Sequence, residues 1–229
     1  TIEIKPSAGQ VDDLLEQIEP YCKLVQSNTD GIIVIPFDED CEKQIEKEVK
    51  KWEVRTKMEM DIEYGEKIIQ KDVNNYVMLM EDGSVVATGG YVRQHDYKGL
   101  KKNMRIVDKA LVDKMLYNIP IEETIMASND PMDFMQVSKV GKTYDRVVYE
   151  MDGQFYETNF VNRSFASNDK KHGALYKQKE GKNRERVANH SDNNYVHNGS
   201  LDDFDMSIID REWYIEMANK RLNHYYGVK

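Results

Sequence analysis

The segment from Leu24 to Ile35 constrains the fold of this chain most strongly. Two runs rich in β-branched and other apolar residues flank the polar sequence Asn28-Thr29-Asp30-Gly31. Runs of this length around residues that tolerate positive φ angles are typical of a β-hairpin. Asn28 and Gly31 both tolerate such angles, so the four polar residues could form an ordinary loop between two strands.

The predicted hairpin also carries one carboxylate at its turn, that of Asp30. Both arms are apolar enough to be buried, so the acid would be held on a rigid support. Proteins bind Mg²⁺ with one or two carboxylates together with phosphate oxygens. The turn is therefore either a plain loop or a place to hold a divalent cation.

Hydrophobic periodicity predicts the elements around the hairpin. Residues 10–19 and 38–55 have apolar side chains at helical spacing, and residues 57–63 alternate as a strand does. Further apolar runs up to residue 92 predict more strands. Together these elements indicate a largely antiparallel sheet with helices on one face.

The second half of the chain has a more helical pattern. Helices are predicted at 106–117, 121–125 and 207–226 from their apolar stripes. Residues 144–156 predict a second hairpin, and the polar stretch 168–199 predicts loops with short strands.

Three short motifs follow one another along the chain: Asn28-Thr29-Asp30-Gly31, then Tyr76 followed by Glu81-Asp82-Gly83, then Ile209-Asp210-Arg211-Glu212-Trp213-Tyr214-Ile215. In this order they resemble family B DNA polymerases, especially phage and mobile-element members. The palm hairpin of that family is usually written Asp-Thr-Asp-Ser, and a later palm strand carries Lys-Lys-x-Tyr. Val73 and Asn74 stand at the two lysine positions here.

The resemblance implies an α+β fold, in which an antiparallel palm-like sheet covered by helices is followed by a mainly helical thumb-like subdomain. Residues 1–97 would be the C-terminal part of the palm, and residues 98–229 the thumb. The chain would then be a fragment of a larger enzyme, as the missing initial Met also suggests. Its partners would be primer-template DNA, deoxynucleoside triphosphates and the fingers, N-terminal palm and exonuclease regions of the parent.

The resemblance also implies that Asp30 is a catalytic residue and a ligand of Mg²⁺. Asn28 replaces the acid that matters less for metal binding in the family, which is compatible with activity. Phosphoryl transfer by two metal ions needs more than one carboxylate. No partner acid is evident ahead of the hairpin, so we expect the fragment alone to be inactive.

Primer and template contacts are expected in two places. If residues 71–76 form one strand, alternation puts Asn74 and Tyr76 on one face. The resemblance implies that this segment contacts the primer, with Lys71 as a nearby cation. Tyr76 could equally be an ordinary aromatic residue of the sheet. Lys101 and Lys102 are expected to grip phosphates from the thumb.

The net charge of −9 is unusual for a protein that grips phosphates. Residues 98–105 and 170–186 are nevertheless basic, which permits either a basic groove or an ordinary solvated face. A non-catalytic nucleic-acid-binding or structural module is therefore the alternative to a polymerase.

Other classes of site find no support in the sequence. The five histidines lack zinc-helix spacing, and the two cysteines form neither a zinc pattern nor a disulfide framework. No glycine-rich phosphate loop is present. With no run of about 18 apolar residues and no signal peptide, we expect a cytoplasmic protein without a membrane span.

Overall fold

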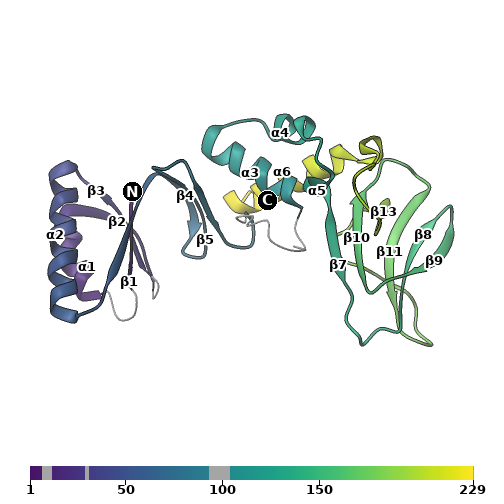
Figure 1. Ribbon diagram of the computed structural model, residues 1–229, viewed down its shortest axis with the longest axis horizontal. Coiled ribbons are helices and arrows are strands. Elements are labelled where there is room, and N and C mark those ends of the chain that lie inside the picture. The colour runs from purple at the N-terminus through teal and green to yellow at the C-terminus, as the bar shows by residue number, and fades with distance from the viewer. Residues whose placement is uncertain (7–11, 29–30, 93–103, 229) are drawn as a thin grey trace. The chain divides into compact units, whose positions relative to one another are not determined.

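The computed structural model describes residues 1–6, 12–28, 31–92 and 104–228 (Figure 1). The chain divides into two compact units, Thr1–Gln94 and His95–Lys229. Each unit has a hydrophobic core of its own. Within the described residues, no helix has both the length and the apolar character needed to cross a membrane.

The first unit is an antiparallel sheet with two α-helices. Its elements are β1 (Ile2–Pro6), α1 (Asp12–Ile18), the 3-10 turn η1 (Glu19–Tyr21), β2 (Cys22–Asn28), β3 (Gly31–Pro36), α2 (Glu39–Thr56), β4 (Met60–Asp72), β5 (Asn75–Met80) and β6 (Val85–Thr88). The strand order is β2-β3-β1-β4-β5-β6. Strands β1 to β4 and helices α1 and α2 form the split βαβ arrangement, in which β1 lies between β3 and β4.

Both helices lie on the same face of this sheet, as Figure 1 shows. The core between these helices and the sheet contains Ile2 and Ile4 of β1, Ile32 and Val34 of β3, and Trp52 of α2. Helix α2 begins where Asp38 accepts a hydrogen bond from the backbone N–H of Cys41, the usual N-cap contact. The predicted helix at 38–55 is therefore confirmed to within a residue at each end.

The opposite face of the sheet is partly covered by the sheet itself. Strand β4 pairs with β1 through its first residues and with β5 through its last ones, with a register shift next to Gly65. Nε2 of Gln70 on β4 donates a 2.5 Å hydrogen bond to Oε1 of Gln26 on β2. Because β3 and β1 separate these strands in the sheet, the β4–β6 part must curl back over the helix-free face.

The predicted continuous strand at 71–76 is wrong, because the chain reverses there. β4 ends at Asp72 and β5 begins at Asn75. Oδ1 of Asp72 accepts hydrogen bonds from the backbone N–H of Asn74 and from the side chain of Asn75. An Asp that binds the backbone two residues ahead stabilises a turn, and here it separates Asn74 from the strand that holds Tyr76.

The second unit combines helices with two small antiparallel sheets. Its elements are α3 (Arg105–Val112), the π-helical turn η2 (Asp113–Tyr117), α4 (Ile121–Ala127), α5 (Pro131–Phe134), β7 (Gln136–Lys139), β8 (Arg146–Met151), β9 (Gln154–Thr158), β10 (Val161–Ala166), β11 (His172–Gln178), β12 (Glu185–Arg186), β13 (Asn194–Val196), the 3-10 turn η3 (Met206–Ile208) and α6 (Arg211–Tyr226). The strand orders are β13-β10-β7 and β12-β11-β8-β9.

The α+β class with an antiparallel sheet is confirmed by these two units. The predicted helices at 106–117, 121–125 and 207–226 correspond to α3 with η2, α4 and α6. The last one begins at Arg211 instead, because Asp210 caps it by accepting from the backbone N–H of Trp213. Beside these helices, the unit has more strands than a mainly helical subdomain would require.

Candidate functional site

The hairpin predicted at 24–35 is present as β2 and β3. The two strands pair from Cys22 opposite Pro36 to Asn28 opposite Gly31, with one register shift between Leu24 and Gln26. Strand β3 lies between β2 and β1, so the hairpin is anchored inside the sheet rather than projecting from it. Thr29 and Asp30, including the predicted catalytic acid, lie outside the described residues.

The end of β1 lies beside the hairpin turn. A Cβ atom added to Gly31 would be 2.7 Å from the carbonyl oxygen of Ile4. Real Cβ contacts are essentially never that short, so glycine allows the close approach of the two backbones here. The end of β1 therefore lies directly beside the first residue of β3.

A cluster of charged side chains occupies the helix-free face next to this turn. Glu3 and Glu63 are directly opposite each other on β1 and β4. Nζ of Lys5 lies 2.6 Å from Oε2 of Glu63 and 3.3 Å from Oε2 of Glu3. Glu3 is only 5% exposed, and its burial raises the pKa of the carboxyl group against the opposing effects of the Lys5 ammonium and the Tyr76 hydroxyl.

The first residues of the sequence contain a signal for this cluster. In Ile2-Glu3-Ile4-Lys5 the apolar and charged residues alternate, as they do in a strand with one buried face. What the alternation could not reveal is that the charged face is also covered, because the covering comes from the distant β4–β6 segment.

The described residues around the turn do not by themselves fit Mg²⁺. The buried carboxylate of Glu3 faces the ammonium group of Lys5, and a cation already occupies the place where a metal ion would have to approach. Within the described ranges, no three His, Cys, Asp or Glu side chains are grouped so that they could hold a metal ion. Mg²⁺ binding at this turn would thus depend on Asp30 and on groups beyond this cluster.

The three residues expected at the primer are now separated into two environments. Lys71, at the end of β4, is exposed, and its Nζ lies 5.3 Å from the ring centroid of Tyr91. Asn74 is exposed in the β4–β5 turn. Tyr76 is only 8% exposed and packs against Ile33 and the methionines of β5.

Only some of the basic residues that are expected to bind phosphates in the second unit are described. Lys101 and Lys102 lie outside the described residues, and so does Lys98. Arg105, which follows them at the start of α3, points instead into its own unit. Its side chain lies 3.4 Å from Asp133 and 3.9 Å from Asp130, so its charge is balanced by carboxylates rather than offered to solvent.

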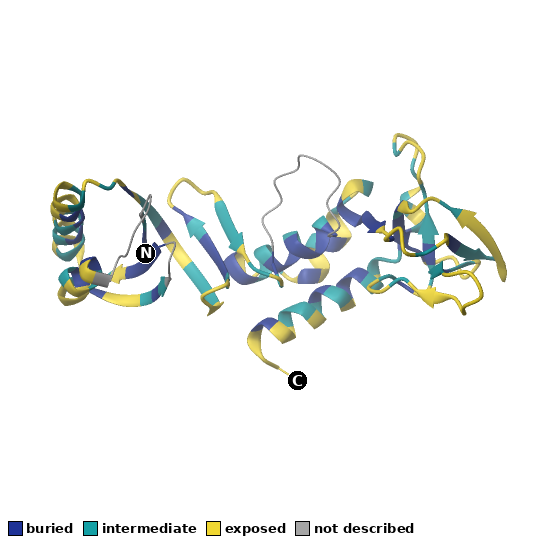
Figure 2. Ribbon diagram, turned by 90° about the horizontal axis from the view of Figure 1, so that it is seen from below, coloured by how far each residue is buried: buried dark blue, intermediate teal, exposed yellow. Residues whose placement is uncertain are grey.

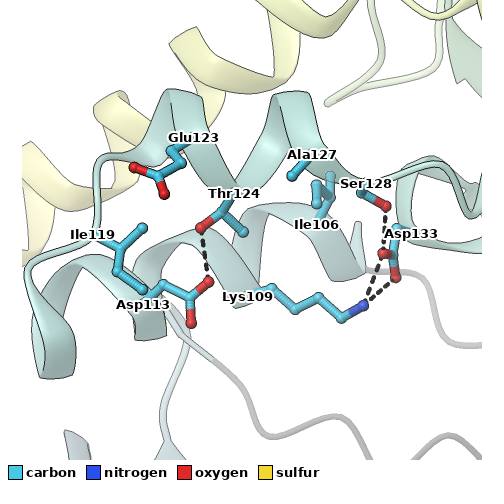
Figure 3. Close-up of a pocket in the computed structure, with 9 residues that line it drawn as sticks. All are labelled: Ile106, Lys109, Asp113, Ile119, Glu123, Thr124, Ala127, Ser128 and Asp133. Atoms are coloured by element: carbon cyan, nitrogen blue, oxygen red, sulfur yellow. Dashed lines mark hydrogen bonds and ion pairs between the residues drawn. The ribbon is translucent and has the colours of Figure 1, made fainter.

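Asp133 also borders a pocket of about 420 Å³ between the α3–η2 segment and α4. Figure 3 shows that Lys109 and Ser128 both reach Asp133, and that Thr124 reaches Asp113. Lys109, Ser128 and Asp133 thus interact with one another, as do Thr124 and Asp113, and these contacts hold α3, α4 and α5 together.

Comparisons with known proteins give one structural similarity to report. No protein-family model matches the chain, and no curated protein matches it. The structure is similar to that of the family B DNA polymerase from the hyperthermophilic archaeon Pyrobaculum calidifontis, with a TM-score of 0.48 and 14% sequence identity. The similarity covers 95% of this chain and 28% of that polymerase, so the chain spans less than a third of that protein's length.

Proposed function

We propose that this chain is the C-terminal palm and thumb of a template-directed DNA polymerase of the phage or mobile-element type. Thr1–Gln94 would be the palm part and His95–Lys229 the thumb. In the intact enzyme the activity would be the addition of deoxynucleotides to a primer 3′ end, and the fragment alone would be inactive.

The observation that supports this proposal best is the position of the β2–β3 hairpin. Its arms pair up to Asn28 and Gly31, so the only acid of the turn, Asp30, directly precedes β3 in the sequence, and β3 is an interior strand of the sheet. Helices cover one face of the sheet only, and the β4–β6 segment covers part of the other face. This is the palm arrangement that the motif resemblance implies.

In the proposed reaction, the residues of this chain hold and orient the substrates. Asp30 would hold Mg²⁺, which neutralises developing charge on the attacking oxygen and the leaving pyrophosphate. Lys71 at the end of β4 and Asn74 in the β4–β5 turn, together with Tyr76, would position the primer strand. Lys101 and Lys102 would bind duplex phosphates without reading the sequence.

Primer extension by the full-length protein that contains this segment tests the proposal. Asp30→Ala should abolish incorporation while leaving the affinity for primer-template nearly intact, because one metal ligand is lost and the DNA contacts remain. Asn28→Ala should cause a milder loss, since a neutral amide contributes little to holding a cation. Incorporation by Asp30→Ala within about tenfold of the wild type would refute the assignment.

One observation favours a non-catalytic nucleic-acid-binding or structural module instead. The strand beside the turn presents Glu3 already paired with Lys5, so it offers no free carboxylate to complete a two-metal site. If this alternative is correct, the Asp30→Ala protein and the wild type will bind primer-template equally and neither will extend it.

A further inference from the structure

The sheet β12-β11-β8-β9 of the second unit has two faces of different character. One face packs into a core through Val147, Leu175 and Tyr149. The other, which we call the outer face, carries Arg146, Val148, Glu150, Phe155, Glu157 and Tyr176, as the cross-strand pairs show. Figure 2 shows that the edge strand of this sheet, β9, is exposed along nearly its whole length.

Two aromatic rings form the centre of the outer face. Phe155 and Tyr176 are in an edge-to-face arrangement with centroids 5.7 Å apart. Together with their neighbours they cover Val148, which is buried, although Phe155 itself is 40% exposed. An exposed aromatic pair on a sheet offers flat surfaces on which nucleic-acid bases can stack.

A guanidinium group lies on this aromatic pair. Cζ of Arg184 is 3.5 Å from the ring centroid of Phe155, which is stacking distance. Arg184 is exposed and, among the described residues, has no carboxylate within ion-pair distance. It therefore presents both a plane for a base and an unneutralised charge for a phosphate.

The surrounding segment is basic in an otherwise acidic protein. Residues 170–186 contain seven Lys and Arg against two Glu, a net charge of +5, whereas the whole chain carries −9. Ion pairs engage only Lys177 with Glu185 and Arg186 with Asp192 among the described residues of this segment. The remaining five cations, Lys170, Lys171, Lys179, Lys182 and Arg184, have no carboxylate within ion-pair distance among the described residues. Of these, Arg184 lies on the outer face, whereas Nζ of Lys179 lies 5.2 Å from the ring centroid of Tyr144, on the core side of the sheet.

We propose that the outer face binds single-stranded nucleic acid. Bases stack on Phe155, Tyr176 and the plane of Arg184, while the charge of Arg184 neutralises a phosphate. A duplex keeps its bases stacked on each other and cannot use the aromatic pair, so the surface favours single strands. This site is separate from the hairpin turn, and its existence does not depend on the polymerase proposal.

The test uses the 229-residue chain and a fluorescein-labelled oligothymidine of about 12 nucleotides, followed by fluorescence anisotropy at about 50 mM salt. Phe155→Ala should weaken binding by about fivefold or more. Phe155→Leu should do the same while still covering Val148, which separates lost stacking from lost packing. Arg184→Gln should make the plot of log affinity against log salt shallower by about 0.7.

The matched control is the next residue along the edge strand. Tyr156 is 39% exposed, nearly as much as Phe155, but it stacks on Tyr149 and belongs to the opposite face. Tyr156→Ala should therefore leave the affinity within about twofold of the wild type. Lys220→Gln, on the exposed side of α6, is the matched control for charge.

Several results would overturn the proposal. Equal losses from Phe155→Ala and Tyr156→Ala would mean that the outer face is not the binding surface. Equal affinity for duplex DNA of the same length, or competition by a polyglutamate peptide, would mean that charge alone is responsible. No measurable binding by the wild-type chain would exclude the site altogether.

Discussion

The hydroxyl group of Tyr214 donates a 2.6 Å hydrogen bond to the carbonyl oxygen of Phe134, eighty residues earlier. The hydroxyl oxygen of Tyr214 in turn accepts a hydrogen bond of 3.0 Å from the backbone N–H of Ala166. Tyr214 is fully buried, and burial raises the pKa of its hydroxyl group. One side chain of α6 thus joins the end of α5 to β10.

Tyr214→Phe should destabilise the second unit. The substitution keeps the ring, which packs edge-to-face against Phe134, but leaves a buried carbonyl and a buried N–H without a partner. The expected loss is about 1–3 kcal/mol in the free energy of unfolding. Urea denaturation measures it. Tyr226→Phe, at the exposed end of the same helix, is the control and should have little effect.

Glu3→Gln should change how the stability of the first unit depends on pH. Because the folded state raises the pKa of Glu3, it binds this proton more tightly than the unfolded state does. The wild type therefore loses stability as pH rises through that pKa, and the variant does not. As the pH rises from about 4 to about 7, the unfolding free energy of the Glu3→Gln variant should increase relative to that of the wild type.

Trp52 gives the readout for this experiment, since it is buried in the first unit and the other tryptophan, Trp213, belongs to the second. A Trp213→Phe background isolates its fluorescence. Glu59→Gln removes an exposed carboxylate of the same unit and serves as the control. Parallel pH profiles for Glu3→Gln and Glu59→Gln would contradict the role assigned to burial.

Tyr76→Phe separates primer contact from packing. The ring remains in its cluster, but the hydroxyl group that partners buried Glu3 is lost. Under the proposed function, the full-length variant should lose affinity for the primer end. If it instead loses about 0.5–1.5 kcal/mol of stability while its primer affinity stays normal, Tyr76 is only a packing residue.

Replacing Lys101 and Lys102 by Ala tests whether these two residues bind DNA phosphates. Each contact to B-form DNA releases about 0.9 counterions, so two lost contacts should make the salt slope for a primer-template duplex shallower by about two units. Lys114→Ala with Lys220→Ala removes the same charge from helical positions of this unit, the first half-buried and the second exposed. An unchanged slope would show that Lys101 and Lys102 are only solvated.

The sequence predicted those elements whose buried positions are apolar. The stripe through Ile45, Val49 and Trp52 located α2, and the apolar arms of 24–35 located the β2–β3 hairpin. In both cases the local pattern and the tertiary packing agree, because the same side chains that define the period also fill the core.

The three-stranded sheet β13-β10-β7 was not predicted, because one of its buried faces is mostly polar. Gln136, Ser138, Asn162, Ser164 and Asn194 are all buried there. A hydrophobicity pattern cannot identify a buried face made of serines and amides. The polar neighbours that stabilise such a face come from distant segments, as when Nε2 of Gln136 donates to the carbonyl oxygen of Asn189.

The candidate site was predicted only where it depends on the hairpin. The order of the motifs led to Asp30, and the pairing of Asn28 with Gly31 agrees with a turn between them. The position of β1 beside that turn could not be predicted, because it depends on a close backbone contact between Gly31 and Ile4.

The central position of β1 has a consequence for how this protein folds. Its two neighbours, β3 and β4, follow it in the sequence, and the pairing of Ile2 with Tyr64 spans more than sixty residues. A ribosome therefore makes β1 before either of its two neighbours, but β1 cannot be paired on both sides until β4 has emerged. Pairing across such separations slows folding, and until then β3 and β4 expose strand edges that can recruit other chains. The strand that is synthesised before both of its neighbours is thus among the last to be fully paired in the sheet.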